Sequence, residues 1–305
     1  AVLIASRSAL ATAAPSVSHC MRLKVAELRK RQVLIGPALF LCLLLAGCSG
    51  SDAPVHEVSG DTETSPQTCQ VNPATLQRRS VARVIDGDTL RLAGGDSLRL
   101  VGVNTSEIGR DGEPDEPLAQ AARAALQKML GPRKEVWLQP AQEQRDRYDR
   151  LLAYAYDADG SSLSAKLIAR GLGFHVAISP NLNLAGCLSA GESTARQRGL
   201  GVWAEPAFIP RAMADLSPGS AGFHLIRDRV TRVSFKDNGW WVQLGGKLGV
   251  KIGDADQHRF TRRELRALEG KTAEARGWLI PRKGGWWMMN VDHPSMLQRV
   301  TKPGA

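Results

Sequence analysis

The stretch from Ser80 to Leu92 constrains the fold most strongly. Apolar and polar residues alternate over residues 80–85 and again over residues 89–92, on either side of Asp86-Gly87-Asp88. Alternation with a period of two is typical of a half-buried strand, and Asp-Gly supplies the backbone angles that tight turns need. The sequence therefore predicts a β-hairpin, which residues 98–103 extend as a third strand.

The following residues predict the rest of a small domain. Pro117 opens a helix over residues 118–130 that Gly131-Pro132 ends, and strands are expected over 135–139 and 151–156. Two further helices, residues 164–170 and 185–198, end at Gly171 and Gly199. Five strands with interleaved helices indicate an α+β fold, an OB-type five-stranded β-barrel with helices over residues 77–210.

Polar residues that suit one kind of reaction recur along this domain. Hydrolysis of a phosphodiester needs oxygen ligands for a hard cation, a carboxylate that activates water, and guanidinium groups that bind a phosphorus centre gaining negative charge. Asp-Gly-Asp-Thr alone is an ordinary turn, but a turn has no need of a distant arginine. All three kinds of group occur in one ordered set of residues, which includes Asp86, Asp88, Arg99, Asn104, Thr105, Glu107, Tyr148 and Arg150.

These residues and their spacing resemble the staphylococcal nuclease (thermonuclease) family over roughly residues 79–206. The resemblance implies that Asp88, Asn104 and the Thr105 carbonyl bind Ca²⁺. It implies that Glu107 is the general base and that Arg99 and Arg150 bind the phosphate. Asp86 falls on an outer-shell acidic position, and Tyr148 falls near the phosphate. The implied products carry a 3′-phosphate and a 5′-hydroxyl.

Three positions depart from the family pattern. Asn104 replaces an aspartate, so the metal shell loses one charge and we expect weaker Ca²⁺ binding. Ser106 and Asp149 replace a proline and a glycine, without removing a reacting group. The family's two nucleotide-stacking tyrosines are expected within residues 176–179, where this chain has no aromatic residue.

The first 76 residues predict export. Basic residues from Arg22 to Arg31 precede an apolar run over 33–46, which ends in Leu45-Ala46-Gly47-Cys48. This is the layout of a secretory signal, and its last four residues resemble a lipoprotein lipobox that would place a lipid on Cys48. The alternative is an ordinary signal peptide in which Cys48 is incidental. We expect residues 1–20 to be non-native upstream translation, 21–47 the signal peptide and 48–76 a flexible tether.

Two cysteines remain after that segment, Cys69 and Cys187. In an oxidising compartment such a pair tends to form a disulfide, and two free thiols are the alternative. His175 has no closely spaced metal-ligating partner, so we expect a structural role for it.

Residues 217–305 predict a second, smaller β-rich domain that resembles an OB-type barrel. They carry 16 Lys and Arg against 8 Asp and Glu, a net charge of +8. They also hold five of the seven tryptophans, of which Trp240 and Trp287 are our candidates for stacking on nucleic-acid bases. In the alternative, one ring of each Trp-Trp pair lies in the core, as alternation demands. A carbohydrate platform is a third interpretation.

The sequence thus predicts a Ca²⁺-dependent nuclease, exported and lipid-anchored to a bacterial membrane through Cys48, in the periplasm or on the cell surface. DNA, RNA or both are the expected substrates, and no protein partner is predicted. The alternative is a nucleic-acid-binding module that has lost turnover. An envelope-structural lipoprotein would leave Glu107 and both arginines unexplained.

Overall fold

The computed structural model of the protein describes residues 69–217 and 219–301, all of them within one compact unit, residues 61–305. The predictions for residues 1–20, for the signal peptide 21–47, for Cys48 and for the tether up to residue 68 lie outside the described residues. Within the described ranges, no helix has both the length and the apolar character needed to cross a membrane.

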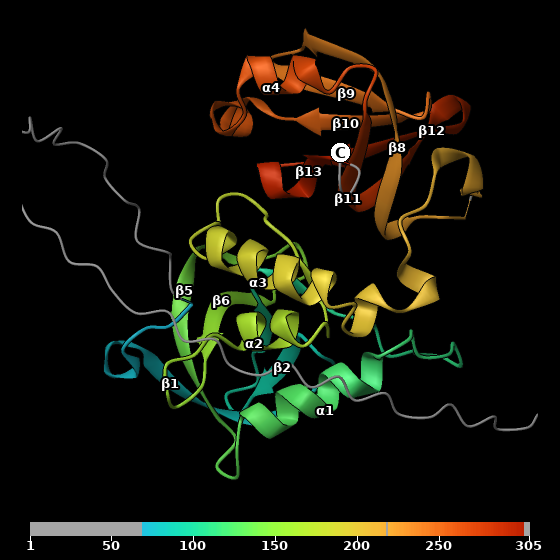
Figure 1. The fold of residues 1–305 in the computed structure, drawn as a ribbon. Helices are drawn as coiled ribbons and strands as arrows, with labels where there is room; N and C mark the ends of the chain where they lie inside the picture. Colours follow the sequence, from blue (N-terminus) through green and yellow to red (C-terminus); the bar gives the residue numbers. More distant parts are fainter. Residues whose placement is uncertain (1–68, 218, 302–305) are drawn as a thin grey trace, which may run out of the picture. The chain divides into compact units, whose positions relative to one another are not determined.

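The first domain is a closed five-stranded barrel (Figure 1). Its strand order is β1-β2-β3-β6-β5, in which β3 and β6 run parallel and the other pairs are antiparallel. Leu90, Leu98 and Tyr156 are among the fully buried side chains inside it. The predicted OB-type barrel is therefore confirmed. The strands are β1 (Gln77–Val84), β2 (Thr89–Leu92), β3 (Ser97–Leu100), β5 (Glu135–Arg145) and β6 (Leu151–Tyr156).

Helices and a short strand pair complete this domain. The Ser162 side chain caps its helix by accepting from the Ala165 amide, and Gly171 and Gly199 follow helix ends with positive φ of 67° and 59°. Leu118, not Pro117, is the residue that precedes the first helix, and it is left-handed. The elements are β4 (Val103–Asn104), α1 (Ala119–Met129), α2 (Leu163–Ala169), β7 (Phe174–His175) and α3 (Ala185–Gln197).

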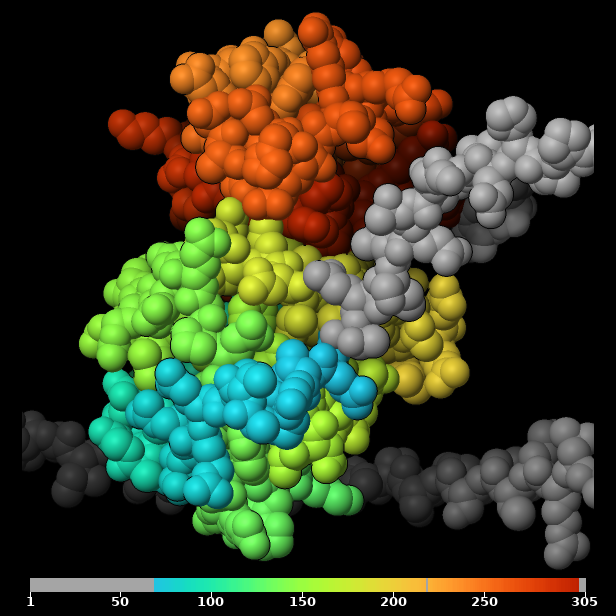
Figure 2. Space-filling model, turned by 90° about the vertical axis from the view of Figure 1, so that its left-hand side faces the viewer, coloured from blue at the N-terminus to red at the C-terminus, as the bar shows by residue number. Residues whose placement is uncertain are grey.

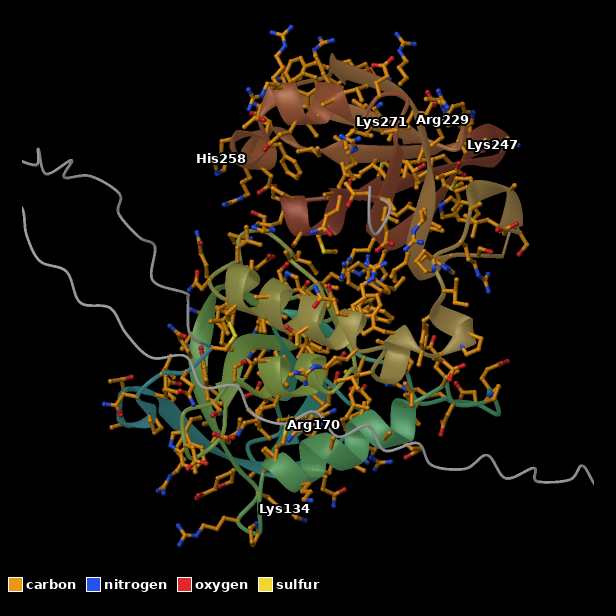
Figure 3. The ribbon with its side chains drawn as sticks, viewed as in Figure 1. Lys134, Arg170, Arg229, Lys247, His258 and Lys271 are labelled. Atoms are coloured by element: carbon orange, nitrogen blue, oxygen red, sulfur yellow. A yellow bond between two sulfur atoms is a disulfide. The ribbon has the colours of Figure 1, made fainter. Side chains whose placement is uncertain are left out.

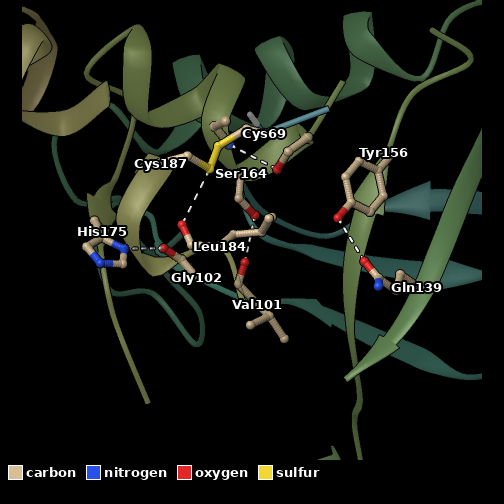
Figure 4. Close-up of a disulfide and its surroundings, with 11 residues drawn as sticks. Cys69, Val101, Gly102, Gln139, Tyr156, Ser164, His175, Leu184 and Cys187 are labelled. Atoms are coloured by element: carbon tan, nitrogen blue, oxygen red, sulfur yellow. Dashed lines mark hydrogen bonds between the residues drawn. A yellow bond between two sulfur atoms is a disulfide. The ribbon is translucent and has the colours of Figure 1, made fainter. Parts of the chain in front are cut away.

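Residues 69–76, which the sequence analysis assigned to the tether, pack on the barrel instead (Figure 2). The Val71 amide donates to the Gly160 carbonyl, and the Ser162 amide donates to the Cys69 carbonyl. Cys69 forms a disulfide with Cys187 on α3, with Cα atoms 5.9 Å apart (Figure 4). These contacts attach the segment to the first domain.

The second domain repeats the strand order of the first. Strands β12-β10-β9-β8-β11 form one sheet that the β11–β12 pairing closes, and β10 and β12 run parallel as β3 and β6 do. The fold-class prediction of a second barrel-like domain is confirmed. β13 was not predicted. The elements are β8 (Gly222–Lys236), β9 (Gly239–Leu244), β10 (Leu248–Ile252), α4 (Arg262–Ala267), β11 (Thr272–Arg282), β12 (Trp286–Asn290) and β13 (Leu297–Arg299).

Seven 3₁₀ turns connect the described elements. They span Pro73–Thr75, Gly201–Trp203, Pro206–Phe208, Met213–Asp215, Asp254–Arg259, Lys283–Gly285 and Pro294–Met296.

The stacking roles expected of Trp240 and Trp287 disagree with the structure. Both rings lie in the core of the second barrel, 7% and 8% exposed, where no base can reach them. Strand alternation turns the other member of a pair outward, and Trp286 is 43% exposed. The basic side chains Arg229, Lys247 and Lys271 are exposed on this domain (Figure 3).

Buried ion pairs and hydrogen bonds join the two barrels. Arg276 on β11 pairs with Glu192 on α3, and both side chains are 5% exposed. Glu274, two residues before Arg276, accepts from Arg196 of α3 and from Arg227 of β8. A shared apolar cluster includes Val176 and Ala177 from the segment after β7. The second barrel therefore packs on the first through α3 and this segment.

Candidate functional site

The β1–β2 turn positions two buried carboxylates. Asp86 and Asp88 are 4% and 2% exposed, and the Asp88 amide donates to Asp86 Oδ1 at 3.0 Å. Gly87 between them has no positive φ. A Cβ there would lie 2.6 Å from Ala122 Cβ and 2.7 Å from Thr105 Oγ1. Glycine is therefore needed for the close approach of the turn to α1 and Thr105, and not for special backbone angles.

Asp88 is the centre of a hydrogen-bonded cluster. Its Oδ2 accepts from the Thr105 amide at 2.8 Å and from Thr105 Oγ1 at 3.1 Å. Arg99 Nη1 lies 2.6 Å from the same oxygen, and Arg99 Nη2 donates to Asn104 Oδ1 at 3.0 Å. The guanidinium of Arg99 thus bridges Asp88 and Asn104. Residues of the β1–β2 turn, β3 and β4 meet here.

The contacts of Arg99 indicate whether a cation would fit the predicted ligand residues. The carboxylate of Asp88 and the amide oxygen of Asn104 both face one positive group, so these two hard oxygen donors converge on a cation position. The donors suit Ca²⁺ chemically, provided that Arg99 moves aside. Among residues 69–217 and 219–301 there is no cluster of three or more His, Cys, Asp or Glu side chains with metal-binding geometry. Asn104 and a backbone carbonyl would have to complete the shell.

Glu107 follows the cluster at the mouth of an open cleft. Its side chain is exposed, and its amide donates to Glu116 Oε2 at 2.9 Å, which closes the intervening loop. Partial removal of water and the nearby Asp88 carboxylate raise the pKa of Glu107, and Arg99 opposes this change. Burial, then the charges of Asp88 and Glu107, raise the pKa of Asp86 to about 7. A bound cation would lower both pKa values, because it favours the ionised carboxylates.

Ser106 lies between the cluster and Glu107. It is 5% exposed, and its Oγ has no hydrogen-bond partner among the described residues. A buried hydroxyl without a partner costs free energy unless a ligand or water bonds it. The sequence marked this residue only as a departure from a proline.

Arg150 is not in contact with this cluster. Its Nε donates to Asp146 Oδ2 at 2.7 Å, and its guanidinium lies 5.5 Å from the centre of the 65% exposed Tyr148 ring. Asp149 before it is left-handed, with φ of 61°, at the position of the family's glycine. Leu152 pairs with Arg99 across β3 and β6, so alternation places Arg150 and Arg99 on the same side of the sheet.

Sequence reasoning missed one wall of the site. The cleft that contains Glu107 has a volume of about 400 Å³ and is lined partly by the second barrel and its approach. Trp278 is one of the five tryptophans in residues 217–305, but their enrichment could not select it. Only long-range packing identifies these lining residues, which are Arg211, Phe223, His224 and Trp278.

A comparison with protein families agrees with this geometry. No curated protein matches the chain. Residues 97–205 match the model of a family described as staphylococcal nuclease homologue. The match includes Arg99, Asn104, Glu107 and Arg150, while Asp86 and Asp88 precede it on the same barrel. The chain therefore contains a domain of the staphylococcal nuclease family.

Proposed function

We propose that the protein is a Ca²⁺-dependent nuclease that hydrolyses phosphodiester bonds of DNA, RNA or both. The observation that carries this proposal is the Asp88–Arg99–Asn104 cluster beside the open cleft of Glu107. The cluster combines oxygen donors for a cation, a guanidinium for a phosphate and a carboxylate accessible to water.

In this proposal Asp88, Asn104 and the Thr105 carbonyl would hold Ca²⁺, which would supply positive charge beside the phosphate. Glu107 accepts the proton of the water whose oxygen attacks phosphorus, and its raised pKa suits a base. Arg99 exchanges its bond to Asn104 for bonds to the phosphate. The P–O5′ bond breaks, and the leaving oxygen takes up a proton to give a 5′-hydroxyl and a 3′-phosphate.

Arg150 would bind the phosphate after its guanidinium leaves Asp146. Hydrogen bonds from Arg150 and the Tyr148 amide hold the pKa of Asp146 low, although burial raises it. The carboxylate therefore stays ionised as the resting partner of Arg150. Tyr148 lies beside this guanidinium and would guide it.

We further propose that the protein is exported and anchored through a lipid on Cys48. The proposal rests on the signal-like sequence around residues 22–48 and on the Cys69–Cys187 disulfide, because disulfides persist in oxidising compartments. A labelled fatty acid should be incorporated into the wild-type chain and not into Cys48→Ser. Equal labelling of both would contradict the anchor.

The activity is tested with the purified chain, single-stranded DNA or RNA, and either Ca²⁺ or a chelator. We expect cleavage with Ca²⁺ that the chelator abolishes. A second candidate, a binding module without turnover, is favoured by Arg99 filling the cation position and by the missing charge at Asn104. Tight binding without cleavage at any Ca²⁺ concentration would support that module and contradict the enzyme.

A further inference from the structure

The cleft beside Glu107 is built by both barrels. Thr105, Ser106 and Glu107 come from the loop after β4, whereas Phe223 lies on β8 and Trp278 on β11. The volume of about 400 Å³ is in the range of small-ligand sites. The second barrel thus forms part of the wall of the cleft that Glu107 also lines.

An aromatic pair forms this wall. Phe223 and Trp278 are paired neighbours on β8 and β11, and their rings meet edge to face with centres 5.2 Å apart. Phe223 also packs 5.5 Å from Phe174 of the first barrel, which is buried. These contacts fix the Trp278 ring, yet 38% of that residue stays exposed. A fixed, accessible indole is a stacking platform.

Polar groups flank the aromatic pair. Arg211 is exposed, and its backbone is held by bonds from its amide to the Leu225 carbonyl and from the Arg227 amide to its own carbonyl. The unpartnered Ser106 hydroxyl lies in the same lining. A cation beside an aromatic face matches a phosphate next to a base.

The segment of the first domain that was expected to carry stacking residues has no aromatic side chain. Residues 176–179 contain no aromatic side chain, and Val176 and Ala177 are buried in the apolar cluster of the second barrel. An aromatic surface near Glu107 is therefore available on Trp278 and Phe223.

We propose that the second barrel provides a nucleoside subsite of the active-site cleft, in which the base next to the cleaved phosphodiester stacks on Trp278 and a neighbouring phosphate binds Arg211. The proposal rests on the nuclease function proposed above. The faces of bases are free in a single strand and covered in a duplex, so the subsite selects single-stranded nucleic acid.

The test compares Trp278→Ala with Trp286→Ala in the purified full chain. Trp286 is a similarly exposed tryptophan of the same barrel that does not line the cleft. On a single-stranded oligonucleotide, Trp278→Ala should raise KM roughly 5- to 150-fold, the range expected for one base–aromatic stack. We expect kcat to change little, and Trp278→Phe to recover most of the affinity. Trp286→Ala should behave as wild type.

A substrate without a nucleoside separates the subsite from the chemistry. Methyl p-nitrophenyl phosphate offers the reacting bond but no base, so Trp278→Ala should hydrolyse it at the wild-type rate. Arg211→Gln should lower the slope of log affinity against log salt by about 1, as expected for one lost phosphate contact. Equal KM values of Trp278→Ala and Trp286→Ala on the oligonucleotide would overturn the subsite and leave the nuclease intact.

Binding without turnover gives an independent readout. If the wild-type chain cleaves neither substrate, the nuclease proposal fails, and fluorescence anisotropy of a labelled single-stranded oligonucleotide then decides about the subsite. Weaker binding by Trp278→Ala than by Trp286→Ala supports it. Equal affinity of the two variants overturns it.

Discussion

Among single residues, Arg99 contacts both side chains of the proposed cation site. Its guanidinium bonds to Asp88 and to Asn104, so in the proposed nuclease the binding of a cation would be coupled to the release of Arg99. A released Arg99 is then free to bind a phosphate.

Glu107→Gln tests the general base. The amide keeps the shape of the side chain but cannot accept the proton of water, so we expect kcat to fall about 10²- to 10⁴-fold. The exposed position of Glu107 should leave thermal stability near that of the wild type. The measurement is cleavage of single-stranded DNA at saturating Ca²⁺. Wild-type turnover in this variant would show that another group is the base.

Asn104→Asp tests the metal shell. A charged ligand at this position should lower the Ca²⁺ concentration that gives half-maximal activity, because Ca²⁺ affinity follows the charge of its ligands. Asn238→Asp is the matched control, since it adds the same charge in an exposed turn of the second barrel. A Ca²⁺ titration of activity compares the two. An unchanged requirement in Asn104→Asp would place this residue outside the shell.

At the scale of elements, the Cys69–Cys187 disulfide joins the segment before β1 to α3 across 118 residues (Figure 4). The chain-entropy model gives a loop of this length a stabilisation of roughly 4 to 5 kcal/mol, which engineered bridges often do not reach. We expect Cys69→Ser/Cys187→Ser to lose free energy of unfolding up to this amount.

Urea unfolding measures this loss, and the wild-type chain with reductant should reproduce it. Mass spectrometry of non-reduced digests identifies the linked peptides. Two free thiols in the folded protein would contradict the pairing.

In the molecule as a whole, the buried Glu192–Arg276 ion pair joins one barrel to the other. Glu192 also accepts from the His175 amide at 2.7 Å, so its carboxylate has bonds on both oxygens. In Glu192→Gln the amide would leave the buried guanidinium without a charged partner. Removing one member of a buried pair typically costs about 3 to 5 kcal/mol, which we expect here.

Glu135→Gln is the control for that substitution. Its partner Arg78 is 63% exposed, and such surface pairs contribute about 0 to 1 kcal/mol. Denaturant unfolding of both variants gives the comparison. Equal losses would show that the buried pair does not hold the barrels together.

His175 makes the same interface sensitive to acid. Its Nδ1 donates to the Gly102 carbonyl, and its Nε2 accepts from Ser295 of the second barrel. Burial above all, with Arg276 and His293, lowers the pKa of His175 from 6.5 to about 4, although the bond to Gly102 opposes this change. Between these values the unfolded chain binds a proton that the folded chain does not.

Stability should therefore be complete above pH 6.5 and fall by up to about 3 kcal/mol as the pH approaches 4. His175→Gln should flatten this part of the profile of stability against pH. His258 is exposed (Figure 3), so His258→Gln should leave the profile unchanged. Denaturant unfolding at several pH values measures both. Parallel profiles for wild type and His175→Gln would exclude this histidine as the cause.

The first barrel and the chain order of its candidate site residues could be predicted from local patterns in the sequence. Alternation around residues 86–88, glycine helix ends at Gly171 and Gly199, and charged residues in loops are local signals, because they depend on backbone angles and on neighbours in the chain. The same kinds of local signal predicted the second barrel, except for the short strand β13, which carries no such signal.

Which side chains these elements bring into contact depends on the tertiary structure. Gly87 is needed because α1 and Thr105 approach it, and Arg99 on β3 bridges Asp88 of the β1–β2 turn and Asn104 of β4. Trp240 and Trp287 lie in the core while Trp278 lines the cleft of Glu107, a choice that depends on how β8 and β11 pack against the first barrel. Contacts between different elements leave no periodic trace in the sequence, so only the three-dimensional structure could reveal them.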